Sequence, residues 1–118
     1  MILQNVARAA AWLLLAAIVV LSLVPPTARP TTTVPHDLEH AGIFLLDGAA
    51  FGIAYLGCEW LLGIGAVAFC AAIEVAQLMV PGRHARVSDF VVDATAACIG
   101  ILAGSLLARM TRRYTRSL

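Results

Sequence analysis

The sequence predicts an all-α, polytopic membrane protein with four transmembrane helices in a small antiparallel bundle. Hydrophobic residues make up 61% of the 118 residues and charged residues only 13%, whereas a soluble globular protein carries about 25% charged residues. The apolar residues are also gathered into four runs, separated by short segments rich in proline, glycine or charge. A chain of this length forms one domain at most. We therefore expect residues 1–118 to be a single membrane domain, with the lipid bilayer as its main partner.

The first apolar run covers about 9–24 and is just long enough to cross a bilayer, which takes about 20 apolar residues. A cleavable signal peptide is the alternative, but Pro25 and Pro26 follow the run where a cleavage site with small residues would be expected. We therefore predict an uncleaved helix. An extracytoplasmic linker over 25–40 should follow it, because its prolines prevent a continuous helix.

The second run covers about 41–56, and a polar segment from His36 to His40 leads into it. Asp37 is expected at the N-cap or in the first turn, where a carboxylate meets the positive end of a helix. On a helix, Asp37, His40 and Asp47 share one face through steps of three and four residues. Asp47 then lies about 10 Å below His40. An acid at that depth should face protein or water rather than lipid.

The third and fourth runs cover about 61–80 and 90–108, and the short turn before the third run favours an antiparallel neighbour. Each run carries a stripe along one face, and small residues four apart let helices approach closely. The stripes are Gly63, Val67, Cys70, Glu74 and Gln77 on the third run, and Asp89, Asp93, Ala96, Gly100, Gly104 and Ala108 on the fourth. We expect them to pack the third helix against the fourth.

The arginines predict the orientation, because cytoplasmic segments of membrane proteins carry an excess of basic residues. With four spans, both termini lie on one side of the membrane. That side holds Arg8, Arg109, Arg112, Arg113 and Arg116, and the other holds Arg29, Arg83 and Arg86. We therefore place the termini in the cytoplasm, with the linker and the loop at 81–89 outside.

The polar residues inside the apolar runs converge at this outward end. Glu74 lies about 10 Å into the third helix, with Gln77 one turn nearer the surface on the same face. Asp93 lies one turn below Asp89. Buried carboxylates need a partner, a proton or water. The basic and imidazole side chains available to them are His36, His40, Arg83, His84 and Arg86.

Three uses of this cluster stay open. In the first, Arg83 forms a salt bridge with Asp89 or Glu74 and only locks the helices together. In the second, the cluster is a pocket for an anionic head group, with Arg83 on a phosphate. Glu74 or Asp89, together with His40, could then act as acid and base.

The third use is a metal site built on His36 and His40, which stand four apart and so share a helix face, with Glu74 or Asp89. The zinc-protease pattern is absent, because Glu39 directly precedes the second histidine, and we predict no metal or cofactor. The net charge of +1 gives no sign of nucleic-acid binding. The cysteines are odd in number, lack zinc spacing and are expected to be small packing residues; they are Cys58, Cys70 and Cys98.

The order and spacing of the polar motifs resemble the VanZ-like family of small bacterial membrane proteins. The shared motifs are Asp37 with His40, Glu74-x-x-Gln77, Pro81-Gly82-Arg83, and Asp89 before a small-residue helix. They extend over about 35–104. The sequence departs from the family at Leu38, Asp93 and Ala96, where the family usually has Lys, Asn and Gly. The resemblance implies a multi-pass protein of the bacterial cytoplasmic (inner) membrane, with a cell-envelope role related to glycopeptide resistance.

The leading hypothesis is an extracytoplasmic polar pocket that binds an anionic lipid-linked or peptidoglycan-related ligand. The candidate ligand-binding residues are Asp37, Gln77, Arg83 and Asp93, and the candidate catalytic residues are His40, Glu74 and Asp89. One alternative is a membrane hydrolase or transferase that acts on a lipid phosphate. Another is a small proton-coupled transporter with Asp47 as its proton site. A homo-oligomer formed through the small-residue stripes also stays open.

Overall fold

The computed structural model describes residues 1–28, 31 and 33–118, and nearly all of them are helical. In chain order the elements are α1 (Ile2–Leu23), the 3-10 turn η1 (Pro26–Ala28), α2 (His36–Ala54), α3 (Glu59–Gln77) and α4 (Val87–Ser117). The predicted linker includes Arg29, Pro30 and Thr32, which lie outside the described residues. Arg29 is one of the three arginines that the predicted orientation places outside the cytoplasm, and the structure does not describe its position.

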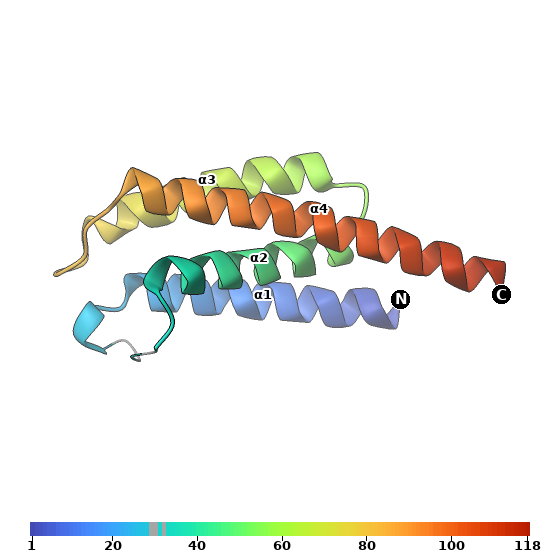
Figure 1. The fold of residues 1–118 in the computed structure, drawn as a ribbon, viewed down its shortest axis with the longest axis horizontal. Helices are drawn as coiled ribbons and strands as arrows, with labels where there is room; N and C mark the ends of the chain where they lie inside the picture. Colours follow the sequence, from blue (N-terminus) through green and yellow to red (C-terminus); the bar gives the residue numbers. More distant parts are fainter. Residues whose placement is uncertain (29–30, 32) are drawn as a thin grey trace.

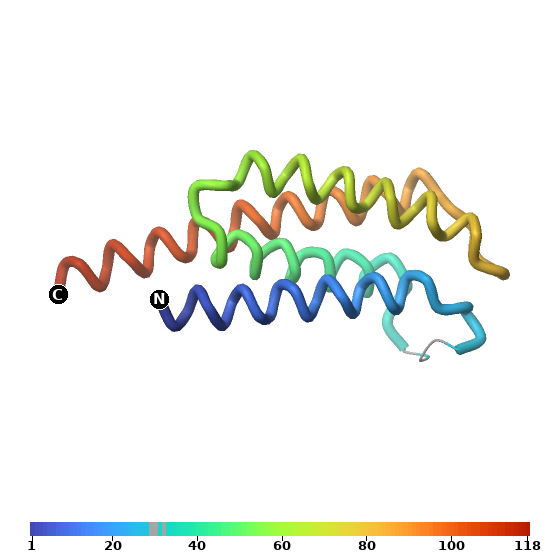
Figure 2. Tube along the Cα trace, turned by 180° about the vertical axis from the view of Figure 1, so that it is seen from behind, coloured from blue at the N-terminus to red at the C-terminus, as the bar shows by residue number. Residues whose placement is uncertain are grey.

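The helices run alternately in opposite directions along one long axis, as the antiparallel prediction requires (Figure 1). Both termini lie at one end of the molecule, which we call the terminal end. Residues 24–28, 31, 33–35 and 78–86 lie at the opposite end, the loop end. The molecule measures 55 × 25 × 21 Å, and α4 projects beyond the other helices at the terminal end (Figure 2).

Within the described residues, three helices are long and apolar enough to cross a membrane, namely α1, α3 and α4. The all-helical, membrane-type architecture that the composition predicts is therefore confirmed. Helix α2 has a comparable length of 19 residues, but it carries Asp37, Glu39 and Asp47.

Two helices are longer than predicted. Helix α1 begins at Ile2 rather than near residue 9, because the polar residues before Ala9 include no proline or glycine that would stop a helix. Helix α4 continues to Ser117 rather than ending near 108, because the basic tail also lacks a helix breaker. The tail is thus part of the last helix.

The other two helices are shifted at their ends. Helix α2 begins at His36, directly after Pro35, so the polar segment that was expected to precede the helix forms its first turns. Helix α3 ends at Gln77 rather than at Val80. The residue before a proline is disfavoured in helical conformation, and Pro81 follows Val80. A tight turn therefore replaces the last predicted helical turn.

Helices α2 and α4 make the closest contact in the bundle. Two glycines on each helix face the main chain of the other, and a methyl group added at any of the four would overlap it. The opposing pairs are Gly48 with Ala97, Gly52 with Ile101, Gly100 with Leu45, and Gly104 with Ala49. The Ser105 hydroxyl also donates a hydrogen bond of 3.2 Å to the Gly52 carbonyl across this contact.

The expectation that the small-residue stripe of the fourth helix packs against the third helix is therefore wrong for Gly100 and Gly104, although α3 does pack against α4. The stripe faces α2, because only α2 offers glycines at the matching four-residue spacing. Gly63 and Gly65 on α3 have no atom of another element close to where a Cβ would stand. Helices α1 and α3 lie on the two sides of the α2–α4 pair in both views (Figures 1 and 2).

Candidate functional site

A polar cavity of about 420 Å³ lies at the loop end, and we call it the loop-end pocket. Its walls come from the linker, the start of α2, the end of α3, the loop after α3 and the start of α4. The charged and imidazole side chains that line it are His36, Glu39, His40, Arg83, His84, Arg86 and Asp89. The predicted convergence of polar helix ends therefore produces a real cavity.

His40 lies at the buried side of this pocket and contacts Asp93. Its Nδ1 atom lies 3.4 Å from both carboxylate oxygens of Asp93, and the two residues are only 8% and 3% exposed. The close approach of α2 and α4 brings them together. Asp93 does not line the pocket; it lies behind His40 and can hold the imidazole in place.

Arg83 attaches the loop after α3 to the C-terminal end of α1. Its Nε donates to the Val24 carbonyl at 3.2 Å, and its Nη2 donates to the carbonyls of Leu21 and Val24 at 2.7 and 2.9 Å. The last carbonyl groups of a helix have no partner within the helix, and a cation is favourable there. Gly82, with a φ of 79°, makes the turn that leads into Arg83.

Gln77 contributes to the same attachment, because its Nε2 donates a hydrogen bond of 3.3 Å to the Ser22 carbonyl. The side chain is 4% exposed and also lines the pocket. Neither Asp89 nor Glu74 forms an ion pair with Arg83 in the described part of the chain. The expected salt bridge from Arg83 to Asp89 or Glu74 is therefore not found, and Arg83 binds main-chain carbonyl groups of α1 instead. A sequence pattern does not reveal such acceptors.

Glu74 lies outside the loop-end pocket. Its Oε1 accepts a hydrogen bond of 2.6 Å from the main-chain N–H of Arg86, the N-cap residue of α4. It lines a shallow depression together with Arg86 and Phe90. Glu74 therefore ties the end of α3 to the start of α4.

The structure brings some of the predicted site residues together and separates others. His40, Gln77, Arg83 and Asp89 all line the loop-end pocket. Asp37 lies in the first turn of α2, as expected, but it is exposed and outside the pocket.

His84 and Arg86 were expected only as partners for the acids, whereas Arg83 was also expected to contact a phosphate. His84 and Arg86 line the pocket themselves. Their position in a short loop between two polar helix ends is the signal that could have marked them as wall residues.

No three His, Cys, Asp or Glu side chains within the described ranges come close enough to hold a metal ion. His36 and His40 do stack on each other, with ring centroids 4.3 Å apart. Among the cysteines, Cys70 is buried and Cys98 half-buried, as expected of packing residues, whereas Cys58 is exposed in the turn before α3.

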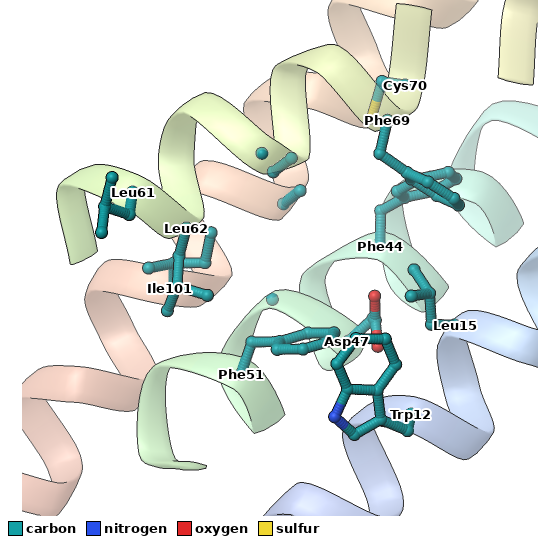
Figure 3. Close-up of a pocket in the computed structure, with 14 residues that line it drawn as sticks. Trp12, Leu15, Phe44, Asp47, Phe51, Leu61, Leu62, Phe69, Cys70 and Ile101 are labelled. Carbon is teal, nitrogen blue, oxygen red and sulfur yellow. The ribbon is translucent and has the colours of Figure 1, made fainter. Parts of the chain in front are cut away.

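Asp47 is 6% exposed, which confirms the expectation that it faces protein rather than lipid. It borders a second cavity in the middle of the bundle, away from the loop end (Figure 3).

Comparisons of the chain with protein-family models, with curated proteins and with solved structures give no match. The resemblance to VanZ-like proteins rests on the sequence motifs.

Proposed function

We propose that this chain is a VanZ-like protein with four spans in the bacterial inner membrane, and that its loop-end pocket binds the anionic head group of a lipid-linked cell-envelope ligand on the outer side. The observation that carries this proposal is the pocket itself. It combines Arg86, His84 and two further histidines in one cavity at the end of an apolar helix bundle.

The fourth span of this proposal is α2. Its 19 residues extend over about 28 Å, close to the roughly 30 Å of a bilayer core. Asp37 and Glu39 lie in its first turn, at the head-group level, and Asp47 is buried by protein. The acids that lower the hydropathy of α2 therefore do not need to contact lipid.

The ligand chemistry follows from the arginines. The guanidinium of Arg83 is engaged with α1, so we assign it to the pocket wall. Arg86 and His84 are exposed, and no hydrogen bond or ion pair joins the Arg86 guanidinium to another described residue. A planar guanidinium binds two phosphate oxygens at once.

The shape of the pocket suits a phosphate that carries a long apolar tail. Its volume of about 420 Å³ lies within the range of small-ligand sites, about 300–1,000 Å³. Glu39 and Asp89 in its walls can accept hydrogen bonds from hydroxyl or ammonium groups, as in a sugar or peptide attached to the phosphate. The apolar outer faces of the helices offer a surface for the tail.

Binding of a polyprenyl phosphate to the purified chain in detergent tests the proposal, with affinity measured by native mass spectrometry or thermophoresis. We expect Arg86→Ala to weaken binding at least about tenfold, because a hydrogen bond to a charged group contributes about 1.5–3 kcal/mol. Arg112→Ala at the terminal end removes the same charge and should bind like the wild type. Equal affinity of Arg86→Ala and the wild type would contradict the proposal.

A hydrolase or transferase acting on a lipid phosphate is the second candidate, and the His40–Asp93 contact favours it. A buried carboxylate behind an imidazole orients the ring as a general base. Release of inorganic phosphate from a polyprenyl pyrophosphate should then be lost in His40→Gln and strongly reduced in Asp93→Asn. Absence of turnover in the wild type, with and without divalent cations, would rule out this candidate.

A further inference from the structure

A second cavity, which we call the Asp47 cavity, has a volume of about 230 Å³ and lies between the four helices (Figure 3). Among the described residues that line it, Asp47 is the only carboxylate. Its lining also includes the large apolar side chains of Trp12, Leu15, Phe44, Phe51 and Phe69. In Figure 3 the Asp47 carboxylate points into the space between Trp12, Phe51 and Leu15.

The Asp47 carboxylate is poorly satisfied by its neighbours. The residue is 94% buried, and its Oδ1 atom has no hydrogen-bond partner within the described residues. The nearby indole N–H of Trp12 is used elsewhere, because it donates to the Tyr55 hydroxyl at 3.0 Å. Burying a carboxylate without a partner costs free energy. A ligand group that pairs with Asp47 in the cavity would offset this cost.

The aromatic rings around Asp47 favour a cation as that group. Trp12 and Phe51 meet edge to face with centroids 5.4 Å apart, and Phe44 and Phe69 lie 6.5 Å apart. Aromatic faces attract ammonium groups, and quaternary ammonium ligands are recognised by aromatic cages. The remaining lining is apolar apart from Cys70, which suits the hydrocarbon part of such a ligand.

We propose that the Asp47 cavity binds a compact lipophilic cation, an ammonium bearing one aromatic ring or short alkyl groups, with Asp47 as its counter-ion. The volume of the cavity agrees with a compact lipophilic cation. An apolar cavity of about 150 Å³ holds a benzene molecule, so about 230 Å³ has room for one ring and a substituted ammonium.

The ligand has a route from the bilayer. Trp12 on α1 and Leu61 on α3 border the cavity and are 56% and 69% exposed. The cavity is therefore bordered by exposed side chains of both helices, and the proposed ligand enters from the bilayer between them. This site is separate from the loop-end pocket and shares no lining residue with it, and its occupation does not depend on the proposed function.

Trp12 provides the signal for a direct test. The chain has two tryptophans, so the substitution Trp60→Phe leaves Trp12 as the only one. In this background, the full chain in detergent is titrated with benzyltrimethylammonium and with neopentylbenzene, its neutral isostere. We expect saturable changes in Trp12 fluorescence, with the cation bound at least about tenfold more tightly than the isostere.

Three variants separate charge recognition from a fold defect. Asp47→Asn should lose at least about tenfold in affinity for the cation while it binds neopentylbenzene as before. Asp89→Asn, which removes an acid of the loop-end pocket, should leave both affinities unchanged. Gly65→Leu should abolish both, because Gly65 lines the cavity and a side chain there has open space to fill.

The proposal is overturned if the wild-type cavity binds the isostere as tightly as the cation. It is also overturned if Asp47→Asn keeps the affinity of the wild type for benzyltrimethylammonium, or if no saturable fluorescence change occurs. Retained binding of neopentylbenzene by Asp47→Asn shows that this variant is folded.

Discussion

Several polar side chains near the loop end bind main-chain atoms at the ends of other helices. Arg83 and Gln77 donate to carbonyl groups at the end of α1, and Glu74 accepts from the main-chain N–H of Arg86, the N-cap residue of α4. Helix ends leave such groups without partners, and in an apolar bundle few other polar atoms are available. The polar residues therefore hold helix ends in register as well as line a pocket.

The role of Arg83 can be tested by its stability effect. Arg83→Ala removes three hydrogen bonds from the end of α1 and should lower the free energy of unfolding by about 2 kcal/mol. Denaturant titration in detergent measures this change. Arg113→Ala, on an exposed turn of α4, is the matched control and should stay within about 0.5 kcal/mol of the wild type. A wild-type stability for Arg83→Ala would show that the contact with α1 is dispensable.

For single residues, the sequence predicts which side chains are buried better than it predicts their hydrogen-bond partners. The helical face and the depth of Asp47 follow from spacing alone, and the residue is buried as expected. The acceptor of Arg83 does not follow from the sequence, because every residue has a carbonyl group. Which carbonyls lie free near the arginine depends on where α1 ends.

At the scale of elements, two glycine stripes decide which helices pair. Gly48 and Gly52 on α2 meet the stripe of α4 so closely that the main chains are in contact. Small residues four apart are typical of such helix pairs. The stripe of the fourth helix could be recognised in the sequence, but its partner could not, since α2 and α3 both contain glycines.

A single added methyl group tests this pairing. In Gly100→Ala the new Cβ overlaps the Leu45 carbonyl, so we expect a loss of about 1–3 kcal/mol from overpacking. The same substitution at Gly63 has open space. It should be neutral, or should stabilise by up to about 1 kcal/mol through helix propensity. Thermal unfolding in detergent measures both, and similar behaviour of the two variants would show that the close contact is absent.

The start of α4 depends on an acid from α3. Glu74→Ala leaves the main-chain N–H of Arg86 without its acceptor, and loss of a capping interaction costs about 0.5–2 kcal/mol. We expect faster amide hydrogen exchange in the first turn of α4, with exchange rates in the middle of α4 unchanged. Glu39→Ala, which removes an acid from α2 instead, serves as the control. Unchanged exchange at the start of α4 in Glu74→Ala would refute this capping role.

At the scale of the molecule, the antiparallel order places both termini at one end and the polar pocket at the other (Figure 1). This arrangement was predictable from the sequence, because short connections between successive apolar runs favour antiparallel neighbours. Whether α2 crosses the bilayer is less predictable, because an acid in the middle of a span, such as Asp47, is tolerated only where neighbouring helices bury it.

Cysteine accessibility tests the proposed topology. Cys58 is exposed in the turn between α2 and α3, and Thr33 is exposed before α2. We expect an impermeant maleimide to label Thr33→Cys in intact cells in a Cys58→Ser background. Native Cys58 should react only after the cells are opened. Labelling of both positions from the same side would mean that α2 does not span, and the reverse pattern would invert the orientation.

In the proposed function, the side chains of the loop-end pocket bind a ligand rather than only one another. The most direct measurement is an experimental structure of the full chain in lipid nanodiscs with a polyprenyl phosphate. We predict phosphate density in the pocket, with the guanidinium of Arg86 and the ring of His84 within about 3 Å of its oxygens, and Arg83 still bound to α1. Phosphate density elsewhere on the molecule, or a loop-end pocket closed by contacts among its own side chains, would contradict the proposed function.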